Sequence, residues 1–215
     1  MLDHLTRQAA IHGLTISGAF HPAPNDPILA KTLILLSPSS DFWAIFKNSV
    51  EGTDKAKNLI DRWSLRVISA LADEQFARPL FPFGGPPYAP FLDWAKQSGR
   101  AFSSPLGMLV HDTYGMMISY RGALAFDQKL QIPAPPTISP CNTCADKPCL
   151  TACPVNAITD AGYNVDRCHQ YLDTNAGETC MTQACQIRTA CPVSVAVKRD
   201  PAHNLLHMRA FKGET

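Results

Sequence analysis

All eight cysteines of this 215-residue chain lie between Cys141 and Cys191, and none precedes them. The first four form the run CxxCxxxxCxxxCP, which ends at Pro154. The other four are Cys168 alone and then the run CxxxxCxxxxxCP, which ends at Pro192. In a reducing cytoplasm, clustered thiols persist as metal-bound thiolates more readily than as disulfides, so this crowding favours metal binding.

The chain is expected to be cytoplasmic. Its N-terminal segment up to Phe20 lacks the basic-then-apolar order of a signal peptide, and its best apolar run, TLILL, is far too short to span a bilayer. Basic and acidic residues nearly cancel, 19 against 18, and no run of lysines or arginines indicates nucleic acid or anionic lipid. We therefore expect protein or small-molecule partners, and neither nucleic acid nor membrane.

The two runs can hold two [4Fe-4S] clusters if they exchange one ligand each. A cubane takes four thiolates, and in two-cluster ferredoxins the cysteine before proline completes the cluster of the other motif. Set one is then predicted to comprise Cys141, Cys144, Cys149 and Cys191. Set two is predicted to comprise Cys153, Cys168, Cys180 and Cys185.

Zinc and disulfides are the alternatives for these cysteines. Two zinc sites of four cysteines would use the same thiolates, but zinc sites are usually built from two close pairs, whereas the second run is dispersed. Disulfides are disfavoured by the expected compartment. The gaps of four and five residues also depart from the bacterial C-x2-C-x2-C-x3-C-P run, so the pattern differs from that of a plain ferredoxin.

The part of the chain before the cysteines alternates helical and strand patterns. We expect helices at 2–12, 41–49 and 61–76, buried strands at 14–20 and 31–38, and a strand pair within 105–126 that turns at 112–115. Gly13 is expected to end the first helix in a left-handed conformation. The longest helix should bury one face, formed by Trp63, Val67, Ile68, Leu71 and Phe76.

A proline-rich segment divides the chain. QIPAPPTISP, residues 131–140, holds four prolines and can continue neither helix nor strand. The sequence therefore predicts an α+β protein with an α/β domain at 1–130 that binds a cofactor or a partner. A linker at 131–140, a two-cluster domain at 141–195 and a C-terminal tail at 196–215 follow.

Two stretches of the first domain offer site residues. RPLFPFGGPPYAPF, residues 78–91, can hold an aromatic wall beside a flat ring, or it can be an ordered surface loop packed on the core. The cofactor-binding candidates are Phe81, Phe83, Tyr88 and Arg121. The turn HDTYG offers Asp112 and Tyr114 as catalytic acids beside His111. The alternative is that Asp112 serves only the turn.

The run CNTCADKPCLTACPVNAI, the following DRCHQYL and the final Cys-Pro group resemble the iron-sulfur portion of epoxyqueuosine reductases and reductive dehalogenases. The resemblance covers about residues 137–195 and implies a ferredoxin-like domain with two [4Fe-4S] clusters. It also implies that a nitroreductase-like α/β domain, which binds cobalamin in those families, comes first. The helical repeat domain of the reductases and the twin-arginine signal of the dehalogenases have no counterpart here, so neither transfer-RNA work nor dehalogenation is expected.

Two functions fit these features. In the first, an electron-donor protein passes single electrons through both clusters to a corrinoid in residues 1–130, which is reduced or reduces a small-molecule substrate. Neither GxGxxG nor GxxxxGK[ST] occurs, so nucleotide binding of the Rossmann or P-loop kind has no support. A flavin bound by another fold is a less favoured cofactor than a corrinoid. In the second, the chain is a non-enzymatic electron carrier or adaptor with no organic cofactor.

Overall fold

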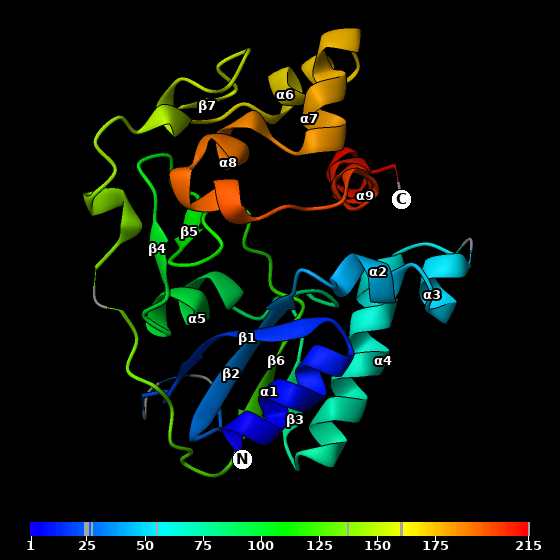
Figure 1. Ribbon diagram of the computed structural model, residues 1–215, viewed down its shortest axis with the longest axis vertical. Coiled ribbons are helices and arrows are strands. Elements are labelled where there is room, and N and C mark those ends of the chain that lie inside the picture. Colours follow the sequence, from blue (N-terminus) through cyan, green and yellow to red (C-terminus); the bar gives the residue numbers. More distant parts are fainter. Residues whose placement is uncertain (24–25, 27, 55, 137, 160, 215) are drawn as a thin grey trace. The chain divides into compact units, whose positions relative to one another are not determined.

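The computed structural model describes residues 1–23, 26, 28–54, 56–136, 138–159 and 161–214. Helices and antiparallel sheets occur together in it, so the chain is an α+β protein (Figure 1). The chain divides into two compact units. Unit 1 consists of Met1–Arg100 and Ser119–Thr137, and unit 2 consists of Ala101–Ile118 and Ile138–Thr215.

Unit 1 is built on a four-stranded antiparallel sheet with the strand order β1-β2-β6-β3. The strands are β1 (Leu14–Phe20), β2 (Thr32–Pro38), β6 (Gly122–Phe126) and β3 (Arg78–Leu80). The strands predicted at 14–20 and 31–38 are therefore confirmed. The inner strands β2 and β6 are buried along almost their whole length, which explains why TLILLS and GALAF are small or apolar without alternating.

Helices pack on this sheet. They are α1 (Leu2–Ile11), α2 (Phe42–Phe46), α3 (Val50–Thr53), α4 (Leu59–Glu74) and α5 (Phe91–Gln97). Helix α1 lies on β1, and α4 lies on β3 and β6 (Figure 1). The helix expected at 2–12 is confirmed, and Gly13 follows it with a φ of 71°, the left-handed conformation that glycine adopts without strain.

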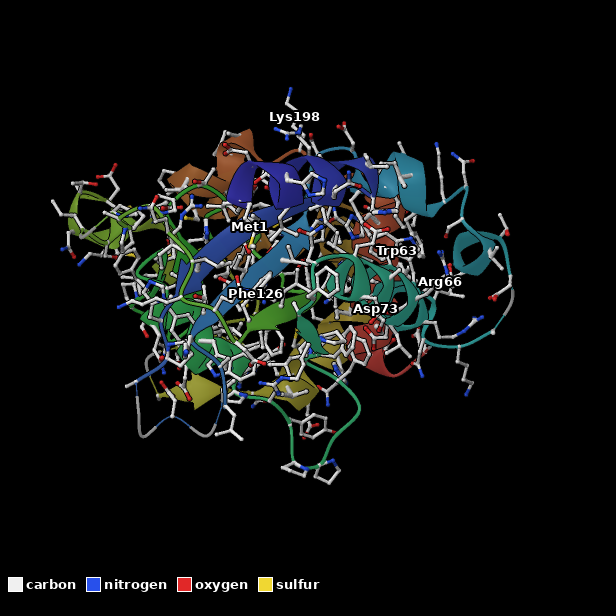
Figure 2. All side chains as sticks on the ribbon, turned by 90° about the horizontal axis from the view of Figure 1, so that it is seen from below. Met1, Trp63, Arg66, Asp73, Phe126 and Lys198 are labelled. Atoms are coloured by element: carbon white, nitrogen blue, oxygen red, sulfur yellow. The ribbon has the colours of Figure 1, made fainter. Side chains whose placement is uncertain are left out.

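Helix α4 supplies most of the predicted core face. Its buried members are Trp63, Val67, Ile68 and Leu71. Trp63, labelled in Figure 2, meets the ring of Phe42 edge-on with 5.1 Å between ring centroids. The prediction for Phe76 is wrong, because its side chain is 94% exposed. The helix ends at Glu74, and Phe76 has a φ of 53°, which takes its side chain off the helical face.

The strand pair predicted within 105–126 is also wrong. Strand β5 (Leu109–His111) pairs with β4 (Ala101–Ser103), whereas β6 pairs with β2 and β3. Every residue of β6 is buried, which suits a central strand and not the second arm of a hairpin. The turn at 112–115 instead closes on itself through an isolated bridge between His111 and Gly115.

Unit 2 is made of short elements. After β4 and β5 come two 3-10 turns, η1 (Pro140–Asn142) and η2 (Pro148–Leu150), and a small pair of strands, β7 (Ile158–Thr159) and β8 (Gly162–Tyr163). The remaining elements are α6 (Val165–Leu172), η3 (Asn175–Gly177), α7 (Glu178–Gln183), α8 (Gln186–Ala190), η4 (Pro192–Ala196) and α9 (Pro201–Lys212). In the described part of the chain, no helix is long and apolar enough to cross a membrane.

The boundary between the units differs from the predicted one. Residues 101–118 belong with the cysteines, because Val110 and Met116 share a buried cluster with Cys149, Ile187 and Cys191. Residues 196–215 also differ from a simple tail, because they contain α9, which packs on α7. The proline-rich stretch falls partly in each unit, and its last proline opens η1.

One ion pair joins α3 to α4. Arg66 donates two hydrogen bonds to the Glu51 carboxylate, from Nε and Nη2, each 2.7 Å long. Arg66 is labelled beside α4 in Figure 2. The Glu51 side chain is only 7% exposed, and its hydrogen bonds with Arg66 lower its pKa to about 2 from an ordinary 4.5. A carboxylate with a lowered pKa stabilises the folded chain above the unfolded pKa, and this contribution is lost as the pH falls toward 2.

We therefore expect Glu51→Gln to lower the free energy of unfolding at pH 7 by about 2 kcal/mol, after allowance for solvent screening of the half-exposed Arg66. Urea unfolding between pH 7 and pH 2 would measure this. The parent should lose stability more steeply than the variant below pH 4.5. Asp54→Asn removes the more exposed pair with Arg62 and serves as the control, with a smaller expected change. Equal pH dependence in parent and Glu51→Gln would contradict the assignment.

Candidate metal centre

Short turns and helices position the eight cysteines within unit 2. Prolines stand at the start of η1 and η2, which suits the fixed φ of proline, and the Ser139 hydroxyl accepts a hydrogen bond from the Cys141 amide. Helices α6 and α7 carry one cysteine each, and two more flank α8. All eight are unbonded thiols that are buried or partly buried: Cys141, Cys144, Cys149, Cys153, Cys168, Cys180, Cys185 and Cys191.

Electrostatic neighbourhoods relate the members of set one. Burial raises the pKa of the Cys141 thiol, and the charges of Cys191 and Cys144 raise it further. Burial also raises the pKa of Cys149, and the charges of Cys141, Cys191 and Cys144 raise it further. These four thiols are therefore close enough to repel one another when they ionise. The group includes Cys191, which lies far along the chain from the other three.

A second neighbourhood contains the members of set two. Burial raises the pKa of Cys168, and the charges of Cys185 and Cys153 raise it further. Burial likewise raises the pKa of Cys180, and Cys185 and Cys168 add to this. Every cysteine that contributes to these shifts belongs to the predicted set of the thiol on which it acts, and the assignment of the sets as cluster ligands stays a prediction.

The sulfur atoms of each set do not converge on a single ion. Among the described residues, no three His, Cys, Asp or Glu side chains are placed to hold one metal ion together. The donor atoms of each predicted set are all sulfur.

A clamp of hydrogen bonds holds the segment around Cys191. The Met116 amide donates to Ser194 Oγ at 2.9 Å, and Arg188 Nη1 donates to the Met116 carbonyl at 2.7 Å. Arg199 Nη2 donates to the Met117 carbonyl at 2.6 Å. The chain on both sides of Cys191 is therefore fastened to the segment that follows the HDTYG turn.

The predicted acids Asp112 and Tyr114 lie in this turn, around a buried imidazole. His111 is fully buried, and its Nδ1 lies 2.9 Å from Asp112 Oδ1. The same nitrogen accepts hydrogen bonds from the amides of Thr113 and Tyr114 at 3.1 and 3.3 Å. The rings of Tyr114 and His111 lie 5.1 Å apart. These contacts order the turn, and a catalytic role for Asp112 or Tyr114 stays a prediction.

Set two has polar neighbours of its own. Burial raises the pKa of Tyr163, and the neighbouring Cys168 thiol raises it further. The Ala157 amide donates to Cys153 Sγ at 3.2 Å. Arg188 lies near Cys185 and Tyr163, and burial lowers the pKa of its guanidinium while those two groups oppose the shift.

The cofactor-binding candidates of unit 1 do not line one pocket. The rings of Phe81 and Phe83 pack on each other with centroids 5.1 Å apart, and Tyr88 is 65% exposed. Arg121 pairs with Asp61 of α4, with 3.5 Å between Nη1 and Oδ1. Burial raises the pKa of Asp61 and lowers that of Arg121, and the Arg121 side chain is 14% exposed whereas that of Asp61 is 39% exposed.

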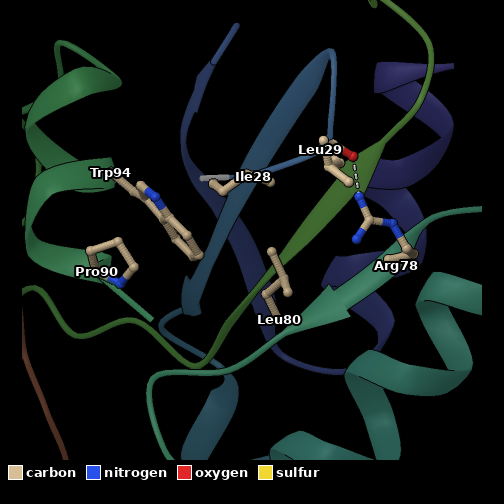
Figure 3. A pocket seen from close by; sticks show the side chains of 6 residues that line it. All are labelled: Ile28, Leu29, Arg78, Leu80, Pro90 and Trp94. Carbon is tan, nitrogen blue, oxygen red and sulfur yellow. Dashed lines mark hydrogen bonds between the residues drawn. The ribbon is translucent and has the colours of Figure 1, made fainter. Parts of the chain in front are cut away.

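A small pocket opens at the base of the 78–91 loop (Figure 3). Its volume is about 290 Å³, and its lining is mostly apolar. The indole of Trp94 projects from α5 toward Leu80, and Arg78 closes the opposite side, where it donates a hydrogen bond to the Leu29 carbonyl. The lining residues are Ile28, Leu29, Arg78, Leu80, Pro90 and Trp94. None of the four candidates lies among them.

Four residues that lie near the cysteines, or bind the segment around them, were not predicted from the sequence: Tyr163, Arg188, Ser194 and Arg199. One signal could have revealed Arg188, because it is the sole charged residue between Cys180 and Val197. Charge in the middle of a cysteine-rich, apolar segment indicates a specific buried partner. The other three carry no comparable signal in one sequence.

Comparisons with protein-family models, with curated proteins and with solved structures found no match for this chain.

Gly115 offers a test of the clamp. It has a φ of 54°, and a Cβ atom there would meet Ser194 Oγ at 2.4 Å and its backbone nitrogen at 2.6 Å. We expect Gly115→Ala to push this segment away and to destabilise unit 2 by about 2 kcal/mol or more. Hydrogen exchange of residues 192–197 should become faster.

Gly107→Ala is the matched control. Gly107 has a φ of 74° in the same unit, but a Cβ atom there would meet nothing within 4 Å. It therefore imposes backbone strain without the collision. If both variants change the exchange of residues 192–197 equally, the contact with Ser194 has no special role.

Proposed function

We propose that the chain is an iron-sulfur electron-transfer protein whose unit 2 holds two [4Fe-4S] clusters, one on each cysteine set. The observation that carries the proposal is the grouping of the thiols, in which Cys191 falls with the first run and Cys153 with the second. An exchange of the Cys-Pro cysteines is the arrangement of two-cluster ferredoxins. It supports a ferredoxin-like organisation of the cysteine segment.

The donor chemistry fits cubanes. Each set offers four sulfur ligands, and soft thiolates suit iron-sulfur clusters. Burial first, and then the charges of neighbouring cysteines, raise the pKa values of Cys141 and Cys149, so these thiols stay protonated in the free chain, and a group that binds them as thiolates must supply positive charge.

The bound clusters would accept and release electrons one at a time. The chain's own part is to hold the thiolates, to limit water around them and to donate hydrogen bonds to sulfur. Val110, Met116 and Ile187 form a buried cluster with Cys149 and Cys191 of set one, and Cys153 and Cys185 of set two pack against the same cluster. The Ala157 amide donates a hydrogen bond to Cys153 Sγ in set two. Burial and hydrogen bonding of this kind set the potential of a cluster.

A corrinoid does not fit the described pocket of unit 1. Pockets for drug-sized ligands occupy about 300–1,000 Å³, and a corrinoid is larger than such ligands, whereas this pocket holds about 290 Å³. Arg121 is engaged with Asp61 inside unit 1. We therefore favour the electron-carrier form of the proposal, with an electron-donor protein and a redox acceptor as partners. The resemblance of unit 1 to nitroreductase-like domains stays a prediction, as does flavin binding.

The first test is the metal content. Protein purified without oxygen should contain about eight irons and about eight acid-labile sulfides per chain, because each set would hold one four-iron cluster. Iron and sulfide assays together with elemental analysis would measure this. A chain that carries zinc in place of iron, or neither metal, would overturn the proposed function.

The second test is the exchange of ligands. Cys191→Ser should disturb the same electron paramagnetic resonance signal as Cys141→Ser, because both belong to set one. Cys153→Ser should disturb the signal that Cys180→Ser affects. If Cys153 and Cys141 instead act on one signal, each run holds its own cluster and the exchange is wrong.

A further inference from the structure

The small pocket of unit 1 is formed by three separate pieces of that unit. Strand β3 is an edge strand of the sheet and contributes Arg78 and Leu80, which lie on one face because side chains alternate along a strand. Helix α5 contributes Trp94. The third piece is the connection between β1 and β2, from which Leu29 lies beside Arg78 (Figure 3). The pocket therefore belongs to unit 1 alone and contains none of the cysteines.

The indole of Trp94 is an apolar wall that is already packed in place. Its ring lies against the ring of Phe91, with centroids 4.9 Å apart and planes at 52°. A flat apolar ligand can therefore pack on the indole without a large loss of side-chain entropy. The indole nitrogen is buried and has no hydrogen-bond partner among the described residues. A buried N–H without a partner costs free energy, so a ligand that brings an acceptor to it is favoured.

Arg78 supplies the charge of the pocket. Its Nη2 donates a hydrogen bond to the Leu29 carbonyl, which holds the guanidinium at the side opposite Trp94 (Figure 3). A guanidinium has five N–H donors in a planar fork, so further donors remain for a carboxylate. Asp127 Oδ1 lies 4.0 Å from Nη2, which is beyond hydrogen-bond distance. Its negative charge nevertheless disfavours a ligand with two negative charges, such as phosphate.

We propose that this pocket binds a small apolar monocarboxylate, whose apolar body lies against Trp94 and Leu80 and whose carboxylate pairs with Arg78. Among the described lining residues Arg78 alone carries a charge, so the site selects one negative charge on an otherwise apolar molecule. The volume of about 290 Å³ is at the lower limit for drug-sized ligands, which suits a molecule with one ring. This binding goes beyond electron transfer and does not depend on the clusters.

The experiment is a titration of the whole chain with phenylacetate, followed by proton-nitrogen correlation NMR of the indole N–H groups. The three tryptophans are Trp43, Trp63 and Trp94, and the Trp94 signal is assigned through its connection to the backbone signals of α5. We expect a saturable shift of the Trp94 signal with a Kd of about 1 mM, as for a small ligand with few contacts. Trp43 and Trp63 lie outside the pocket lining and should not shift.

A neutral probe and two variants test the role of the charge. Phenylacetamide has the same ring without the negative charge, and it should bind the parent about fivefold more weakly than phenylacetate. Arg78→Gln should weaken phenylacetate binding by about the same factor and leave phenylacetamide binding nearly unchanged. The control is Arg62→Gln, because Arg62 is also half-exposed and ion-paired, to Asp54, but does not line the pocket. It should change neither affinity.

Leu80→Phe tests the place of binding. The larger side chain occupies part of the pocket and should abolish the saturable shift with both probes, while the signals of Trp43 and Trp63 stay in place. The absence of a saturable shift at Trp94 in the parent would overturn the proposal. Equal affinities for the two probes, or unchanged phenylacetate binding in Arg78→Gln, would overturn it as well. If Arg78→Gln does not fold, the two probes on the parent and on Leu80→Phe still decide.

Discussion

Repulsion between neighbouring thiolates is the constraint on which unit 2 depends. Burial and the charges of other cysteines both raise the pKa of Cys141, Cys149 and Cys168, so four ionised thiols cannot remain together unaided. The fold places them together nonetheless, through short proline-led turns and helices of a few residues. Such elements bury little apolar surface of their own, and the stability of this region is therefore expected to follow what the thiols bind.

The part of the fold that follows from local pattern was predictable. The first helix has apolar residues at helical spacing and stops before Gly13, and the two strands after it are short apolar runs in a segment rich in glycine, proline and serine, so their sequences define them. The strand pairing of residues 101–126 was not predictable. A turn signal between two strand patterns is compatible with a hairpin, but also with two strands that pair with other parts of the chain. Burial of all five residues of β6 decides between them, and burial depends on strands far away in sequence. The prediction that Phe76 is buried was wrong for a local reason, because Phe76 has a positive φ just past the end of the helix.

For the site, the sequence predicts two sets of thiols from the positions of the cysteines, but it does not predict what surrounds them. The spacing rule for Cys-Pro motifs needs only the positions of the cysteines, whereas Arg188 and Ser194 act through tertiary contacts. The aromatic loop shows the opposite case. Its composition indicated an aromatic wall for a ligand, yet Phe81 and Phe83 pack on each other. The pocket beside the loop is lined mainly by residues near the two ends of the loop. The composition of a loop can therefore indicate that the loop is ordered, but it does not show which residues the loop contacts.

Helix α8 has a consequence for how this chain can vary in length. Its five residues are flanked by Cys185 of set two and Cys191 of set one, so the helix fixes the separation and the relative direction of these two cysteines. Each residue of an α-helix advances the chain by about 1.5 Å and turns it by about 100°. A single insertion would therefore swing Cys191 to a different side of the helix, out of phase with Cys141. The turn at Gly107 between β4 and β5, which is exposed and where a Cβ atom would meet nothing within 4 Å, has no such phase to keep. Lengthening should be tolerated there and not in α8.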